Sequence, residues 1–228
     1  SAVVVDSADN IILAGRTASD GAGGYDCLIA KYNSSGSLQW DRTLGSSLTN
    51  VAHGVTVDSA DNIIISGYTT VDAFKDHAEF LIAKYNSSGT PQWYRTLGRS
   101  GTFVTDLGYG VTADSADNII VVGYVDSTSG RSYDAVVAKY NSSGSILWSK
   151  NLGGAGTDNF LSAAVDSADN IIIAGYTGSD GAGGDDTGGD DDGGVDETGG
   201  DLGEDDTGGD EGGDDTAEDD AGGDDAGG

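Results

Sequence analysis

Carboxylate and imidazole side chains are the groups with which this chain could do chemistry, and the carboxylates recur in one pattern. The sequence Asp-Ser-Ala-Asp-Asn-Ile-Ile begins at Asp6, Asp58, Asp114 and Asp166. Paired carboxylates suit Ca²⁺, but a calcium loop of the EF-hand type needs more oxygen ligands and a closing Glu. Asp and Asn also accept local backbone hydrogen bonds and tolerate the left-handed conformation that a hairpin turn requires. We therefore expect a turn here, not a metal site.

The two histidines, His53 and His77, lie in different loops of the second repeat. Asp76 and Glu79 lie close to His77 in sequence and could assist a metal ion or a proton transfer. No nucleophile or second histidine stands at a recognisable catalytic spacing from either residue. An enzyme would need His53, His77, Asp76 or Asp106 to converge in the fold.

The repeats are spaced 52, 56 and 52 residues apart and consist of short strand-like segments. In the second repeat we expect strands at 54–57, 63–68, 80–85 and 92–97, and no segment has the periodicity of a helix. The continuous apolar run at 63–65 needs cover on both faces, which neighbouring sheets supply. Four-stranded antiparallel units at this spacing predict an all-β, β-propeller-like array, with a β-helix or a two-sheet sandwich as alternatives.

Several segments resemble the bacterial β-propeller repeat called the SBBP repeat, which is related to the NHL propellers. The segments are Ala164–Thr177, Asp134–Tyr140 and Leu152–Asp158, and the resemblance covers residues 1–178. It implies a building block of secreted and surface proteins. The Gly- and Asp-rich C-terminal segment resembles linkers that precede surface-anchoring segments in some Gram-negative bacteria. Together these resemblances imply an extracellular or cell-surface location.

Composition divides the chain near Gly178. Residues 1–178 carry all 10 Lys and Arg and 18 of the 39 acidic residues, so their net charge is 10 − 18 = −8, against −21 for residues 179–228. A segment so rich in Gly and acidic residues cannot offset its ordering entropy by burial, and we expect 179–228 to be a disordered spacer. Weak, diffuse Ca²⁺ binding there would fall on Asp185, Asp186, Asp190, Asp191 and Asp192. This acidity argues against nucleic acid and anionic membranes as partners.

The array is expected to hold fourteen strands, which is three and a half units. Their approximate bounds are 1–52, 53–107, 108–159 and, for the partial unit, 160–178. Closed propellers typically have about four to eight blades. We therefore expect a piece of a longer array, with apolar faces and strand edges exposed at its ends.

Strand direction places both tight turns of each unit, Ser-Ala-Asp-Asn and Asn-Ser-Ser-Gly, at one rim. The loops at the opposite rim vary in length and charge, and binding residues usually lie on variable loops held by a rigid scaffold. The ligand-binding candidates are therefore the acidic residues and histidines of that rim: Asp20, Asp26, His53, Asp72, Asp76, His77, Asp106, Asp126, Asp134 and Asp158.

Aromatic and basic residues recur at fixed positions of the fourth strand. Trp40, Trp93 and Trp148 could stack on sugar rings, but identical placement in each unit favours packing between units. Arg42, Arg95 and Lys150 are expected to be solvated charges that protect a strand edge. Cys27, at the start of an apolar strand, is expected to be a buried small residue rather than a nucleophile.

These observations favour a secreted or cell-surface module that binds or scaffolds, without catalysis and without a cofactor. Its partner would be a protein or a glycan on the variable rim, with no nucleic acid and no insertion into a membrane. A propeller-type hydrolase or lyase is the first alternative. A matrix element that self-associates through its open faces is the second.

Overall fold

The computed structural model describes residues 1–18, 24–45, 48–71, 77–98, 105–126, 132–154 and 156–178. All of them belong to one compact unit, Ser1–Val195. The described residues form fourteen strands: β1 (Ala2–Val5), β2 (Ile11–Thr17), β3 (Asp26–Tyr32), β4 (Leu38–Leu44), β5 (Asn50–Val57), β6 (Ile63–Thr70), β7 (Ala78–Tyr85), β8 (Pro91–Leu97), β9 (Leu107–Ala113), β10 (Ile119–Asp126), β11 (Tyr133–Tyr140), β12 (Ile146–Leu152), β13 (Asp158–Val165) and β14 (Ile171–Thr177).

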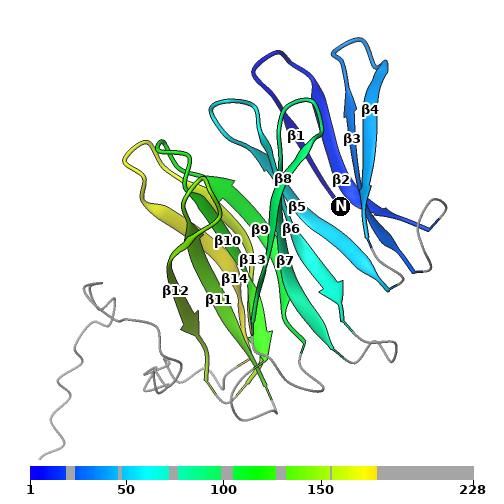
Figure 1. Ribbon diagram of the computed structural model, residues 1–228. Helices are drawn as coiled ribbons and strands as arrows, with labels where there is room; N and C mark the ends of the chain where they lie inside the picture. The colour runs from blue at the N-terminus through cyan, green and yellow to red at the C-terminus, as the bar shows by residue number, and fades with distance from the viewer. Residues whose placement is uncertain are drawn as a thin grey trace, which may run out of the picture. The chain divides into compact units, whose positions relative to one another are not determined.

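The strands pair in chain order into four antiparallel sheets (Figure 1). Sheet 1 is β1–β4, sheet 2 is β5–β8, sheet 3 is β9–β12, and sheet 4 is the hairpin β13–β14. The all-β prediction of three and a half units is therefore confirmed for the described residues, which contain no helix that could span a membrane. The first strands of successive sheets contact one another, β1 with β5, β5 with β9 and β9 with β13, and we call them the inner strands.

The hydrophobic core consists of three layers, each between two consecutive sheets. Because side chains alternate between the faces of a strand, neighbouring residues of β6 enter different layers. Ile63 and Ile65 pack against sheet 1, whereas Ile64 packs against sheet 3. The third layer joins sheet 3 to the hairpin of sheet 4. The continuous apolar runs in the sequence thus have cover on both faces, as predicted.

The end of the sheets with the two tight turns, which we call the turn rim, is held by buried carboxylates. Asp58 Oδ1 accepts the backbone N–H groups of Ala60 and Asn62 at 3.0 and 2.8 Å, and Oδ2 lies 2.8 Å from Lys84 Nζ. Asp6 and Asp114 repeat these contacts with Lys31 and Lys139. The second Asp of each motif has a positive φ, near 60°. The prediction of a turn is confirmed.

These contacts keep the buried carboxyls ionised. Burial by itself raises the pKa of Asp6, but the hydrogen bonds from Lys31, Asn10 and the backbone outweigh it and lower that pKa to about 2. The same balance lowers the pKa of Asp58 and of Asp114. At neutral pH each of these carboxylates therefore forms an ion pair with its lysine, which is buried for Lys31 and Lys84 and partly buried for Lys139.

Hydrogen bonds also run from each sheet to the next along the turn rim. Ser7 donates its N–H and Oγ–H to the two carboxylate oxygens of Asp61, at 2.9 and 2.6 Å. Ser59 with Asp117 and Ser115 with Asp169 repeat this pair. The second Asp of the motif therefore has two roles. Its backbone adopts the left-handed conformation of its own turn, and its side chain accepts hydrogen bonds from the preceding sheet.

The recurrent residues of the fourth strand also act between sheets. The Trp40 ring lies against Gly89 and the Trp93 ring against Gly144, where an added Cβ would come within about 3 Å of the ring, so the packing prediction is confirmed. Arg42, Arg95 and Lys150 are exposed, as expected for solvated charges, and two of them also reach the neighbouring sheet. Arg42 Nε donates to Gly89 O at 3.0 Å, and Arg95 Nε donates to Gly144 O at 2.9 Å. The turn that accepts each bond belongs to the neighbouring sheet, which a single repeat does not reveal.

Candidate functional site

The inner strands carry an extra residue near the end opposite the turn rim, which we call the loop rim. In β5 the pairing with β6 skips His53, in β9 the pairing with β10 skips Tyr109, and in β13 the pairing with β14 skips Leu161. Such β-bulges re-aim a side chain and are frequent near active sites. The same strand position is thus used in three sheets to redirect one side chain.

A glycine on the second strand makes room for each bulge. A Cβ on Gly67 would lie 1.9 Å from Val51 O, and one on Gly123 would lie 2.0 Å from Leu107 O. Gly175 has the same relation to Asn159 O. The residue after each glycine is a tyrosine: Tyr68, Tyr124 and Tyr176. In sheet 1 the corresponding residue is Arg16.

The redirected residues and these tyrosines form a continuous aromatic cluster across sheets 2 and 3. The His53 ring stacks on Tyr109 with 4.9 Å between ring centroids and lies 5.7 Å from Tyr68. Tyr124 lies 6.0 Å from Tyr109 and 4.6 Å from Tyr133. We call these five residues the aromatic cluster. All five are partly exposed, so part of the cluster is open to solvent.

The aromatic cluster is uncharged at neutral pH. Burial lowers the pKa of His53, and the chain N-terminus and Arg16 lower it further, against the opposing effect of the hydrogen bond to Gly108 O at 2.9 Å. Since a carbonyl oxygen only accepts, Nδ1 carries the proton and Nε2 remains an acceptor. Burial is also the main cause that raises the pKa of Tyr68, Tyr109 and Tyr124.

Polar groups frame the aromatic cluster on two sides. Asn159 forms a side-chain hydrogen bond with Tyr109, and its buried Oδ1 has no hydrogen-bond partner. In sheet 1, the Arg16 guanidinium lies 4.4 Å from the centroid of the Tyr25 ring. The surroundings thus offer hydroxyl groups, one unsatisfied amide oxygen and one cation beside the rings.

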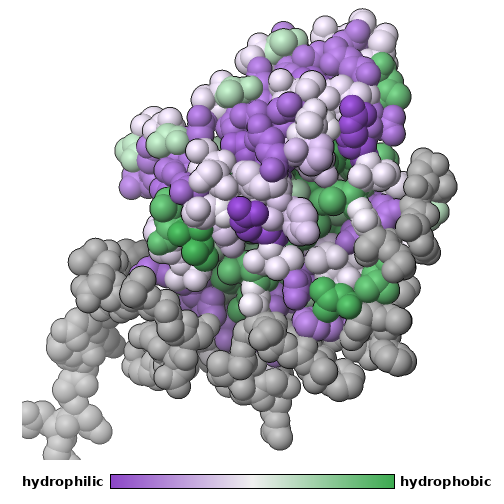
Figure 2. Space-filling model, viewed as in Figure 1, coloured by the Kyte–Doolittle hydropathy of each residue, from purple (hydrophilic) through white to green (hydrophobic). Residues whose placement is uncertain are grey.

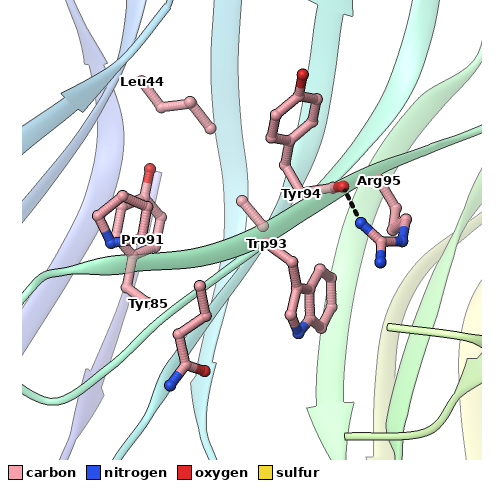
Figure 3. A pocket seen from close by; sticks show the side chains of 8 residues that line it. Leu44, Tyr85, Pro91, Trp93, Tyr94 and Arg95 are labelled. Carbon is pink, nitrogen blue, oxygen red and sulfur yellow. Dashed lines mark hydrogen bonds between the residues drawn. The ribbon is translucent and has the colours of Figure 1, made fainter. Parts of the chain in front are cut away.

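Two hollows lie among the described residues. One, of about 230 Å³, adjoins the aromatic cluster and is lined by Thr49, Tyr68, Thr70, Ala78, Thr105 and Leu107. The other, of about 640 Å³, lies away from the cluster and is lined by Leu44, Ala83, Tyr85, Pro91, Gln92, Trp93, Tyr94 and Arg95 (Figure 3).

The larger hollow is the weaker candidate, because its basic side chain is already engaged. Arg95 donates to Tyr94 O at 2.7 Å, the dashed line in Figure 3, as well as to Gly144 O. The smaller hollow joins the aromatic cluster through Tyr68 and extends the same surface. The cluster and this hollow together are the candidate functional site.

Several of the predicted ligand-binding residues anchor the loop rim. Asp106 is fully buried and its Oδ1 accepts the N–H of Asp126 at 2.8 Å, while Asp158 Oδ2 accepts the N–H of Gly154 at 3.0 Å. Asp26 is buried, and its Oδ1 has no hydrogen-bond partner. Asp134 is partly buried beside Gly153. Their ligand-binding role stays a prediction.

The two histidines differ in their surroundings. His53 belongs to the aromatic cluster, whereas His77 precedes β7 and has a buried Nε2 without a hydrogen-bond partner. Among the described residues no group of His, Cys, Asp and Glu could hold a metal ion. Asp20, Asp72, Asp76 and the five aspartates predicted to bind Ca²⁺ diffusely lie outside the described residues.

The sequence predictions named His53 but not the tyrosines around it. A signal was present, because the dipeptide Gly-Tyr recurs at 67–68, 123–124 and 175–176. The dipeptide alone does not indicate a site, since it also fits a buried strand end. Its meaning depends on the bulge in the adjacent inner strand.

Comparisons with known proteins support the fold. An uncharacterized WD repeat-containing protein of Acanthamoeba polyphaga mimivirus is 23% identical over 189 residues, a match that covers 62% of this chain and 13% of that protein. The chain has a β-propeller-like repeat fold. Because the match covers 13% of the viral protein, this chain corresponds to a small part of that relative. No protein-family model matches this chain.

Two solved structures resemble the chain more loosely. A protein of unknown function from Bacteroides caccae aligns with a TM-score of 0.47 and 14% identity, over 75% of this chain and 51% of that one. A fucose lectin from Kordia zhangzhouensis, solved in complex with methyl-fucoside, aligns with a TM-score of 0.35 and 11% identity, over 68% and 97% of the two chains.

Proposed function

We propose that this protein is a binding module of the SBBP type, secreted or displayed at a cell surface, which holds a glycan at the aromatic cluster and performs no catalysis of its own. The observation that carries the proposal is that two bulges redirect His53 and Tyr109 into one cluster of partly exposed rings. A rigid scaffold with a few redirected side chains is the usual construction of a binding site.

The chemistry of the aromatic cluster favours a sugar over a charged ligand. Stacked rings offer flat apolar faces to the C–H groups of a pyranose, while tyrosine hydroxyls can hydrogen-bond its hydroxyl groups. The unsatisfied Oδ1 of Asn159 is an acceptor beside these rings. The neutral state of His53 leaves Nε2 as a further acceptor. Neutral or weakly anionic sugars therefore match the cluster, with Arg16 available for an acidic group.

A glycan array followed by calorimetry on the strongest binder tests the proposal. We expect Tyr109→Ala and Tyr124→Ala each to weaken binding at least about tenfold, by analogy with aromatic residues at the centre of an interface. Tyr94→Ala is the matched control, because Tyr94 is an exposed tyrosine of the larger hollow.

The outcomes separate the site from its rivals. A loss of binding in Tyr94→Ala equal to that in Tyr109→Ala would move the site to the larger hollow. Binding of none of the glycans on the array would overturn the choice of ligand. Mass spectrometry of a bound glycan after prolonged incubation tests the absence of catalysis, since cleaved product that disappears in His53→Ala would establish an enzyme.

A further inference from the structure

The first and last sheets expose the two complementary halves of one interface. The molecule builds this interface three times, between sheets 1 and 2, 2 and 3, and 3 and 4. The layers place the sheets in chain order, so sheets 1 and 4 are the outermost of the described sheets, and Figure 1 shows sheet 1 (blue) at one side of the array. Each outermost sheet therefore keeps one face uncovered by any described sheet.

The free face of sheet 1, which we call the leading face, consists of Val3, Val5, Ile11 and Leu13. The corresponding residues of sheet 2 are Val55, Val57, Ile63 and Ile65, and these pack into the layer against sheet 1. On sheet 1 the same positions are 36–61% exposed. The leading face is thus the half of the interface that normally receives a preceding sheet.

The free face of sheet 4, which we call the trailing face, consists of Ala164, Ile172 and Ala174. Ile172 is 57% exposed, whereas the corresponding residue of sheet 1, Ile12, is fully buried against sheet 2. Ala14, which corresponds to Ala174, is likewise buried in that layer. The trailing face is thus the half that normally receives a following sheet.

The polar pairs of the turn rim are incomplete at the same two faces. Ser7, Ser59 and Ser115 donate to the second Asp of the following motif, which is Asp61, Asp117 or Asp169. By this rule Ser167 of sheet 4 would donate to a following Asp, and Asp9 of sheet 1 would accept from a preceding Ser. Neither residue has such a bond among the described residues. The donor Ser167 and the acceptor Asp9 therefore remain at opposite ends of the array of sheets.

We propose that the trailing face of one copy of this chain binds the leading face of a second copy, with Ser167 donating to the partner's Asp9. The hairpin of sheet 4 offers the first two strands of the trailing half, and its opposite face already packs on sheet 3. The two surfaces are different, so the contact is head-to-tail and each copy offers one surface of each kind. Two copies supply the apolar layer and the hydrogen-bonded pair that each face lacks.

Mass measurements on the full chain test the proposal. Light scattering across a concentration series, with salt added to screen the net charge of −29, is expected to show association of the unchanged protein. Leu13→Asp on the leading face and Ile172→Asp on the trailing face are each expected to stay monomeric. A mixture of the two variants is expected to give a 1:1 dimer, because each contributes the face that the other has lost.

The mixing result distinguishes head-to-tail binding from other associations. An unchanged protein that is monomeric at all concentrations overturns the proposal, and so does a mixture that remains monomeric. Association of either variant alone would show like faces pairing with each other and would also overturn it. Melting curves confirm that the variants fold, which we expect because both positions are exposed.

A second pair of variants avoids changes in the apolar faces. Ser167→Ala removes the hydroxyl hydrogen bond and is expected to weaken association about fivefold. Asp9→Ala would remove that bond and the bond from the Ser167 N–H, as the pair of Ser7 with Asp61 shows, and is expected to weaken association more. Combining them in one chain is expected to weaken association no further than Asp9→Ala alone, because Asp9→Ala already removes the bond that Ser167→Ala removes. Full additivity would overturn the pairing of these two residues.

Discussion

The two rims of this molecule use polar groups in opposite ways. At the turn rim, carboxylates such as Asp58 are buried, paired with lysine and hydrogen-bonded to backbone N–H groups. At the loop rim, the rings of the aromatic cluster are partly exposed, and buried acceptors on Asn159 and Asp26 have no partner. The surface coloured in Figure 2 is mostly hydrophilic over the turns, with apolar patches nearer the other end. The turn rim thus holds the fold through buried ion pairs, whereas the loop rim combines buried anchors such as Asp106 with partly exposed rings.

The difference between the rims has a physical origin in the antiparallel pairing. Both hairpin turns of a unit fall at one rim, so the repeated Asp, Asn and Gly residues build the turns and join neighbouring sheets there. The connections at the other rim are free to vary, and a bulge in the inner strand redirects one side chain without disturbing the turns. Substitutions at the turn rim are therefore expected to affect stability, and those at the loop rim binding.

The largest expected effect is that of Lys84→Ala. The ammonium group of Lys84 lies 2.8 Å from Asp58 Oδ2 and also donates to Ser142 O, and both side chains are buried. Removing the lysine leaves a buried carboxylate without its counter-ion, which typically costs about 3–5 kcal/mol. Denaturant unfolding of residues 1–228 with and without the substitution measures the loss.

The double variant Asp58→Asn with Lys84→Met is the control for this prediction. It removes both charges together, so we expect it to be less destabilised than Lys84→Ala alone. A single variant that loses less than about 1 kcal/mol would mean that water reaches the carboxylate. The turn rim would then differ less from the loop rim than the contacts indicate.

A smaller effect is expected from the bonds between sheets. Asp61→Ala loses two hydrogen bonds from Ser7. Asp9→Ala changes the same position of the first turn, which no described sheet precedes. Both residues have φ near 60°, so replacement by alanine carries the same cost in backbone strain at the two positions. The excess loss of unfolding free energy in Asp61→Ala should be about 1–2 kcal/mol.

The difference between Asp61→Ala and Asp9→Ala isolates the bonds between sheets, because both substitutions change the same position of the same kind of turn. The measurement belongs at low protein concentration, where association through Asp9 makes no contribution. Equal losses in the two variants would show that the bonds between sheets add nothing to stability. The turn rim would then be a row of independent hairpins.

Much of the fold could be predicted from the sequence, because its signals are local. The turn role of Asp58, the strand at 63–65 with two covered faces and the packing of Trp93 each follow from one repeat or from exact recurrence. The bond from Arg95 was not predicted, because its acceptor, Gly144 O, belongs to the next sheet. A repeat shows which residues recur but not which neighbour they reach.

The candidate site was predicted less completely. Variable loops pointed to the correct rim for His53, whereas Tyr109 depends on a bulge, which is a property of strand pairing rather than of composition. Asp106 was chosen for its carboxylate, and the structure shows it anchoring the N–H of Asp126. A carboxylate in the sequence does not by itself distinguish a ligand-binding residue from a loop anchor, because short acidic side chains can serve as either.

The smallest expected effect concerns His53 and the pH dependence of stability. Its pKa is lowered in the folded protein, chiefly by burial, so at mildly acidic pH the unfolded chain binds a proton that the folded chain does not. The contribution of His53 is complete above the pKa of an unfolded histidine, about 6.5, and is lost as the pH falls below it. Denaturant unfolding at pH 7.5 and 5.5 should show a steeper loss for the unchanged protein than for His53→Phe, by a fraction of a kcal/mol. An identical slope in the two proteins would mean that the imidazole stays solvated, and the aromatic cluster would then be less closed at His53 than its contacts with Tyr109 and Gly108 indicate.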